Sequence, residues 1–206
     1  MVQGFFFVYG GEMANVIDAQ KAFSNLLDIE YEFVLGRKSK SVALRVEFQK
    51  YHFFHLAGLQ YLKDLPKLAI QAEEIYKQIE NGQLTQNYIE SSVFYGRIKD
   101  RIDYLPYLEQ IFDSNDTIFK YNPALQSFSV IEADFLLKNE INKTPIFVFL
   151  SKGKNEKFFC KSFFPEIKKD YSDRQTKWTV LLRKKINKAT NTETVLYKHK
   201  NFATPE

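Results

Sequence analysis

Cysteine is almost missing from this sequence, because its 206 residues include only Cys160. One thiol cannot form a disulfide framework within the chain, and this usage is typical of a reducing compartment. Long apolar runs are missing too. The run at residues 4–9 is too short for a transmembrane helix, and no basic residue precedes it as in a signal peptide. These absences predict a cytoplasmic protein that does not enter a membrane.

Several catalytic signatures are also absent. The sequence contains no glycine-rich phosphate loop, no nucleophile elbow and no carboxylates clustered at metal-binding spacing. His52 and His55 are three residues apart and could share a helix face, but a metal would need a third ligand such as Asp64 or His199. The usual zinc spacings are not found. The sequence therefore predicts neither a metal nor a cofactor.

Apolar and aromatic residues, by contrast, are plentiful. The hydrophobic fraction of 45% is enough for a substantial core, and the chain holds 20 Phe and 12 Tyr. Phe at alternating strand positions favours core packing over the second interpretation, a set of platforms on which bases stack. The length suits one domain. We expect a single domain at residues 12–206, preceded by a tail or short strand at residues 1–11.

Positive charge is concentrated in the last quarter of the chain. Residues 151–206 hold 14 Lys or Arg against 6 Asp or Glu, a net of +8, whereas the first 150 residues have a net of −4. Such segregation indicates a polyanionic partner. A solvated lysine-rich face would produce the same composition, and because lysine outnumbers arginine here the two interpretations stay open.

The hydrophobic period divides the chain into three parts. Residues 13–27 follow a helical period, and residues 29–35 and 42–48 then alternate as in a β-hairpin. Helical spacing continues from residue 51 to residue 112, with Pro66 in a first turn, Thr85 as a cap and a break at Pro106. Six strands are predicted after that, at residues 117–121, 130–138, 146–151, 157–164, 178–184 and 193–198.

Short turns between these strands indicate antiparallel pairing. We therefore predict an α+β fold: an N-terminal helix and β-hairpin, a central helical block, and a C-terminal antiparallel β-meander that forms a curved sheet with the helices on one face.

His55 is the first candidate for chemistry. An imidazole titrates near neutrality and can exchange protons with a ribose hydroxyl. A histidine hydrogen-bonded within the core is the competing interpretation. Gly58 lies inside the same helical pattern, at a cost relative to alanine, which indicates that another group packs closely against it. Cations could hold a phosphate near His55, and the candidates on the strands are Arg45, Lys120, Lys152, Lys161, Arg183 and Lys198, with Ser162 as a neutral donor.

Ordered short segments resemble the phage- and mobile-element-associated subfamily of the barnase–EndoU–colicin–RelE-like nucleases. The most specific one is His52-Phe53-Phe54-His55-Leu56-Ala57-Gly58-Leu59, and the resemblance runs from about residue 23 to residue 202. The other segments are residues 31–36, 46–48, 75–76, 101–102, 118–122, 133–137, 163–164 and 196–198.

This resemblance implies cleavage of RNA without metal, by attack of the ribose 2′-hydroxyl on the adjacent phosphate. It also implies that His55 is the general acid or base and that Lys120 and Lys198 stabilise the phosphate. RNA is then the expected partner, together with a protein inhibitor or antitoxin. The alternative is a non-catalytic interaction module that binds nucleic acid or a protein through its basic C-terminal sheet. For the enzyme, we expect the basic strands and the His55 helix to form opposite walls of one cleft.

Overall fold

The computed structural model describes residues 14–114, 117–126, 129–166, 169–200 and 202. The tail or short strand predicted at residues 1–11 lies outside this part of the chain. No helix among the described residues is both long and apolar enough to cross a membrane.

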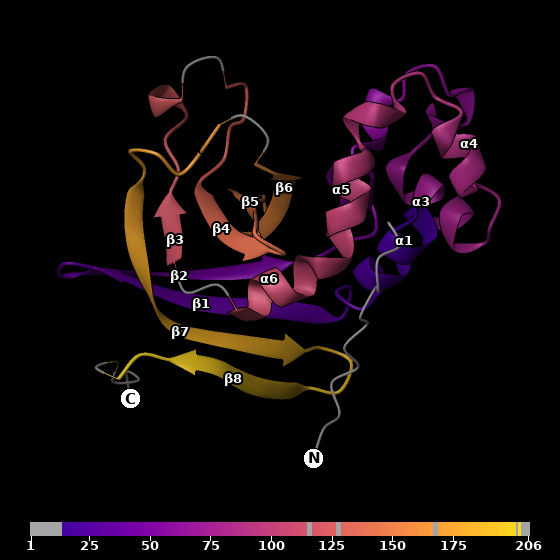
Figure 1. Cartoon of the computed structure of the whole chain (residues 1–206). Helices are drawn as coiled ribbons and strands as arrows, with labels where there is room; N and C mark the ends of the chain where they lie inside the picture. Colours follow the sequence, from indigo (N-terminus) through magenta and orange to yellow (C-terminus); the bar gives the residue numbers. More distant parts are fainter. Residues whose placement is uncertain (1–13, 115–116, 127–128, 167–168, 201, 203–206) are drawn as a thin grey trace.

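The strands form one sheet that closes on itself. Its order is β1-β2-β6-β5-β4-β3-β7-β8, and β1 also pairs with β7, so seven strands complete a ring while β8 lies beside the second half of β7 (Figure 1). The strand bounds are β1 Ile29–Arg37, β2 Lys40–Glu47, β3 Thr117–Lys120, β4 Phe135–Ile141, β5 Thr144–Lys152, β6 Phe158–Pro165, β7 Thr176–Asn187 and β8 Thr192–Lys198.

The prediction of an open, curved antiparallel sheet is therefore wrong. Strands β3 to β6 do form an antiparallel meander, but β7 returns to β3 and β1 instead of joining β6. The ring is mixed, because β2 meets β6 in parallel at the pair Val46–Phe158. Alternation in a sequence identifies strands but not their distant partners, and closing the ring removes exposed strand edges.

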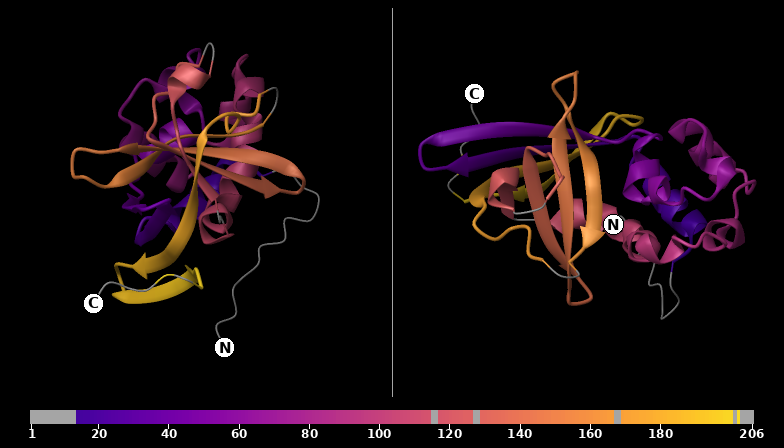
Figure 2. Two further views of the ribbon diagram at one scale, coloured as in Figure 1. Left: turned by 90° about the vertical axis from the view of Figure 1, so that its left-hand side faces the viewer. Right: turned by 90° about the horizontal axis from the view of Figure 1, so that it is seen from above.

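The helices gather at one end of this barrel and do not cover one face of a sheet, which is a second correction (Figure 2). The tip of the β1–β2 hairpin projects at the opposite end. The α-helices are α1 Val16–Ser24, α2 His52–Leu56, α3 Ala72–Glu80, α4 Gln86–Glu90, α5 Lys99–Tyr104 and α6 Leu108–Ser114. The 3₁₀ turns are η1 Leu59–Tyr61, η2 Pro66–Leu68, η3 Tyr95–Arg97, η4 Leu105–Tyr107 and η5 Pro123–Leu125.

Local sequence signals explain where several helices begin and end. Asn15 forms a capping box with Asp18 at the start of α1, and the Thr85 side chain caps α4 as predicted. Pro106 separates α5 from α6, also as predicted. The expected helix at residues 51–63 ends early, because Gly58 has a left-handed φ of 78° and divides it into α2 and η1.

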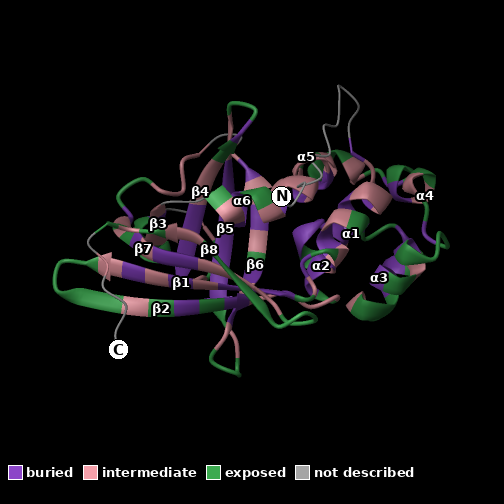
Figure 3. Cartoon of the chain, turned by 90° about the horizontal axis from the view of Figure 1, so that it is seen from below, coloured by how far each residue is buried: buried purple, intermediate pink, exposed green. Residues whose placement is uncertain are grey.

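Two apolar clusters stabilise the barrel. The larger one fills the interior and continues under the helices, with Phe33, Leu44 and Val148 among its fully buried residues. Buried residues lie along the strands, whereas the residues at the tip of the β1–β2 hairpin are exposed (Figure 3). The high phenylalanine content thus serves core packing. The smaller cluster, formed by Tyr121, Leu136, Phe147 and Phe149, lies apart from the first one.

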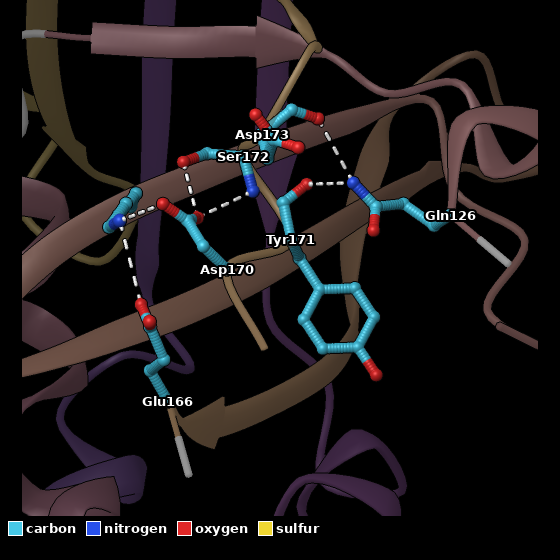
Figure 4. A network of polar contacts seen from close by, with 7 residues as sticks. Gln126, Glu166, Asp170, Tyr171, Ser172 and Asp173 are labelled. Carbon is cyan, nitrogen blue, oxygen red and sulfur yellow. Dashed lines mark hydrogen bonds and ion pairs between the residues drawn. The ribbon is translucent and has the colours of Figure 1, made fainter. Parts of the chain in front are cut away.

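A covering segment at residues 169–175 closes the smaller cluster, with the Tyr171 ring 5.5 Å from the Phe149 ring. Polar contacts hold this segment in place (Figure 4). Lys138 Nζ lies 2.7 Å from Asp170 Oδ2, and the other Asp170 oxygen accepts hydrogen bonds from the Ser172 amide and hydroxyl. Gln126 Nε2 donates to the carbonyls of Tyr171 and Asp173. These side chains therefore have a structural role.

Candidate active site on helix α2 and strand β6

Helix α2 lies against strand β6, and His52 anchors its first turn. The His52 ring stacks on Phe159 with centroids 5.0 Å apart and planes 13° apart. Its Nδ1 accepts a hydrogen bond of 3.1 Å from the Gln49 amide. Burial lowers the pKa of His52 to about 4, so the ring is neutral at physiological pH. His52 is therefore a packed, structural histidine.

Arg101 of α5 anchors the other end of α2. Its Nη1 donates a 2.7 Å hydrogen bond to the Phe163 carbonyl of β6, and its guanidinium lies 5.2 Å from the Phe164 ring centroid. A Cβ on Gly58 would lie 2.8 Å from Arg101 Cδ, so only glycine leaves room for this side chain. The close packing predicted at Gly58 is thus confirmed. The helix is held along β6 from Phe159 to Phe163.

His55 is the histidine that this arrangement exposes. It lies in α2 between the two anchors, and its side chain is accessible to solvent. Partial burial lowers the pKa of His55 below its usual value, because burial disfavours the charged imidazolium. A neutral, accessible imidazole at pH 7 can accept a proton from a bound hydroxyl.

A β-bulge places two polar residues of β6 on the outer side of the strand. Ser162 pairs with Phe149 and Cys160 pairs with Leu150, so Lys161 has no residue opposite it. Lys161 is exposed, and Ser162 shares the outer face of Phe149. Adjacent strand residues normally face opposite sides, but the bulge relaxes this constraint. Lys161 and Ser162 thus lie on the stretch of β6 between Phe159, which contacts His52, and Phe163, whose carbonyl binds Arg101.

The other predicted cations lie on other strands, and of these Lys152 of β5 lies opposite Phe158 of β6. Lys120 and Lys152 meet at Asp134, which lies 3.5 Å from Lys120 Nζ and accepts a hydrogen bond from the Lys152 amide. Three strand spacings separate β3, which carries Lys120, from β6, about 14 Å in all. Arg45 is paired with Glu32 at 3.3 Å.

Two of the predicted residues lie on β7 and β8. Arg183 is only 5% exposed, with its guanidinium 5.9 Å from the Tyr197 ring centroid. Lys198 ends β8 opposite Leu182, toward the hairpin tip. The expected single cleft, with the basic strands opposite the His55 helix, is therefore not what the described residues form. Lys161 and Ser162 are the predicted residues on β6, the strand against which α2 packs.

Sequence reasoning did not select Arg101 as a residue of the site. The signal for it was its place in one of the segments that carry the resemblance, residues 101–102. Among the described residues, no three His, Cys, Asp or Glu side chains gather closely enough to hold a metal ion. Burial raises the pKa of the Cys160 thiol, which leaves it protonated inside the barrel.

Comparison with known proteins agrees with the resemblance. Residues 15–200 match the family model described as phage-Barnase-EndoU-ColicinE5/D-RelE like nuclease 4. No curated protein and no solved structure matches the chain. The match covers nearly all of the described barrel and helices, so it applies to the chain as a whole.

Proposed function

Since the chain belongs to the phage-Barnase-EndoU-ColicinE5/D-RelE like nuclease 4 family, we propose that it is a metal-independent endoribonuclease with its active site at α2 and β6. In this proposal His55 transfers protons, and Lys161 with Ser162 binds the scissile phosphate. Lys120 and Lys198 lie away from α2, so they contact the RNA farther along its length. A chain that cuts cellular RNA is harmful to its host, and we expect a protein inhibitor as its partner.

One observation carries this proposal: three separated segments that resemble the family meet at α2 and β6. Residues 52–59 supply α2 and Gly58, residues 101–102 supply Arg101, and residues 163–164 supply the carbonyl that Arg101 binds. Each contact between these segments fixes the backbone of the helix that presents His55. The anchored helix suits catalysis, because proton transfer requires a side chain held in place.

The chemistry follows from the properties of these groups. Neutral His55 accepts the proton of a ribose 2′-hydroxyl as its oxygen attacks the adjacent phosphorus atom. The bond from phosphorus to the 5′-oxygen breaks, that oxygen takes a proton from water, and the protonated His55 releases its proton to the resulting hydroxide. Lys161 compensates the negative charge that develops on the phosphate oxygens. The products are a 2′,3′-cyclic phosphate and a 5′-hydroxyl end.

Cleavage of a fluorescent oligoribonucleotide in EDTA tests the proposal directly. We expect wild type to cut it and His55→Ala to be at least about 100-fold slower, since general acid–base catalysis contributes about 10²–10⁴. Lys161→Ala should also lose activity, whereas Lys154→Ala, at an exposed lysine of the β5–β6 turn, should not. Product analysis should find the cyclic phosphate.

An oligonucleotide of the same sequence with 2′-deoxyribose should stay intact, because it lacks the attacking hydroxyl. Circular dichroism and the melting temperature show that each variant is folded before its rate is compared. If RNA stays intact with wild type and His55→Ala alike, the nuclease proposal fails and the non-catalytic interaction module replaces it.

A further inference from the structure

A basic hollow of about 560 Å³ lies at the tip of the β1–β2 hairpin. We use the name "tip hollow" for it. Strand β7 and the residue after β8 complete its wall. Its lining residues are Gly36, Arg37, Lys38, Ser39, Lys40, Ser41, Lys177, Thr179, Leu181 and His199.

Positive charge in the tip hollow is not compensated within the described part of the chain. Arg37, Lys38, Lys40 and Lys177 are all exposed, and none of them has an acidic side chain within 4.0 Å among the described residues. Cations on neighbouring parts of the same strands are paired. Arg45 contacts Glu32 and Lys184 contacts Glu193. The four cations thus face solvent together, and no carboxylate of the described residues forms an ion pair with them.

Close packing and a backbone hydrogen bond stabilise the shape of the tip hollow. A Cβ on Gly36 would lie 2.6 Å from Leu181 Cδ1, so glycine lets Leu181 form the floor. The His199 amide donates a 2.8 Å hydrogen bond to the Leu181 carbonyl, which fixes the segment after β8 against β7. Lys38 has a left-handed φ of 55° in the two-residue turn. That conformation is unfavourable for lysine, yet a cation occupies it.

We infer that the tip hollow is a second nucleic-acid site, which binds the phosphate backbone. Phosphate oxygens can accept hydrogen bonds from the four cations and from the hydroxyls of Ser39, Ser41 and Thr179. No Phe, Tyr or Trp is among its described lining residues, so the site does not stack bases and binds without sequence preference. The inference rests on membership of the nuclease family, but it does not depend on cleavage.

The tip hollow and the proposed active site lie at opposite ends of the β1–β2 hairpin. Helix α2 follows the end of β2, where Glu47 pairs with Glu30, whereas Arg37 lies at the tip. Arg37 lies seven residue steps along β1 from Glu30, which corresponds to about 24 Å. A stacked strand carries one phosphate every ~3.4 Å, so about seven nucleotides span the length of the hairpin.

Binding of a fluorescent 12-nucleotide RNA tests the inference, with His55→Ala as the background so that the RNA is not cut. Adding Lys40→Glu and Lys177→Glu should weaken binding at least 10-fold. Affinity should also become less dependent on salt, with the log–log slope reduced by about 0.7 for each phosphate that the variant no longer binds. The matched control adds Lys21→Glu and Lys63→Glu on the helical side, which changes the net charge equally. This control should bind within twofold of the background.

Equal affinity for the tip-hollow variant and its control would overturn the inference, and would leave an acidic protein as the partner of the tip hollow. Cleavage is measured separately in variants that retain His55. Loss of RNA binding without the tip-hollow cations, in a chain that never cuts RNA, would therefore support this site while contradicting the proposed activity.

Discussion

His52 and His55 illustrate how little separates a structural from a reactive residue. They are three positions apart in α2, but His52 stacks on Phe159 and is 5% exposed, whereas His55 is open to solvent. Helical spacing alone placed both histidines on one face. Contact with β6 decided which of them became buried, and a sequence does not show which strand a helix will meet.

The depressed pKa of His52 makes stability depend on pH. An unfolded histidine takes up a proton near pH 6.5, whereas the folded ring does so only near pH 4. The contribution of neutral His52 is therefore complete above pH 6.5 and is lost as pH falls from 6.5 to 4. Between pH 7.5 and pH 4.5 we expect a loss of about 2–3 kcal/mol in the free energy of unfolding from this residue.

Urea denaturation at both pH values measures this effect. His52→Asn offers an amide oxygen to the Gln49 amide but has no titratable ring. Its free energy of unfolding should change by about 2–3 kcal/mol less than that of wild type between the two pH values. An identical change in both proteins would show that His52 is not the source.

At the scale of elements, the joint between α2 and α5 depends on Gly58. Both Gly58 and Gly82 have positive φ angles, 78° and 71°. Only Gly58 is crowded, with Arg101 Cδ and Ile98 Cγ2 each 2.8 Å from an added Cβ, whereas nothing lies within 4 Å of one at Gly82. Alanine substitutions at these two glycines therefore distinguish the effect of backbone strain on stability from the effect of crowding.

We expect Gly58→Ala to destabilise the protein by about 3 kcal/mol, of which about 1 kcal/mol is the left-handed conformation and the rest is overpacking. Gly82→Ala should lose only about 1 kcal/mol. Gly58→Ala should also slow RNA cleavage, because Arg101 would have to move and release α2. Thermal or urea unfolding and a cleavage assay measure both effects, and equal destabilisation by the two variants would contradict the role given to Arg101.

Most elements could be predicted from the sequence, because their signals are local. The hairpin at residues 29–48, the Thr85 cap and the break at Pro106 depend on residues that are neighbours in the chain. The bulge at Lys161 could not be predicted, since it is defined by pairing with β5. That pairing is what allows Lys161 and Ser162 to lie on the same side of β6.

At the scale of the whole molecule, the ring is weakest where β2 meets β6. These strands share the single pair Val46–Phe158, and nearby Glu30 lies directly opposite Glu47. Two like charges at opposed strand positions repel each other. Lys157 Nζ lies 2.6 Å from Glu30 Oε2 and 3.3 Å from Glu47 Oε2, so it compensates both carboxylates.

Lys157→Met should therefore destabilise the protein by about 1–2 kcal/mol, a value reduced for the partial exposure of this lysine. Contacts to Asn155 and Lys157 lower the pKa of Glu47 despite its burial. The stabilisation that ionised Glu47 gains from these contacts is present above the unfolded pKa of about 4.3. It is lost as pH falls through the pKa of Glu47 in the folded protein. The matched variant Lys154→Met should change stability by less than about 0.5 kcal/mol. Urea midpoints at pH 7 compare them, and equal midpoints would contradict the bridging role of Lys157.

Ring closure also explains why the site was only partly predictable. Cationic residues could be chosen from composition and strand pattern, but their grouping depends on how the ring closes. Pairing of β1 with β7 brings Lys177 and Thr179 to the hairpin tip, away from α2. The excess of charge in residues 151–206 is thus distributed around the barrel and is not gathered opposite His55.

The pairing of β1 with β7 has a consequence for synthesis on the ribosome. The hairpin emerges early, but the strand that completes the tip hollow is translated only after all the helices and strands β3 to β6. At about 5–20 residues per second, the interval between residue 40 and residue 200 is roughly 10–30 s. During that time the nascent chain exposes an unpaired β1 edge. It acquires the tip hollow only when β7 and His199 reach the hairpin.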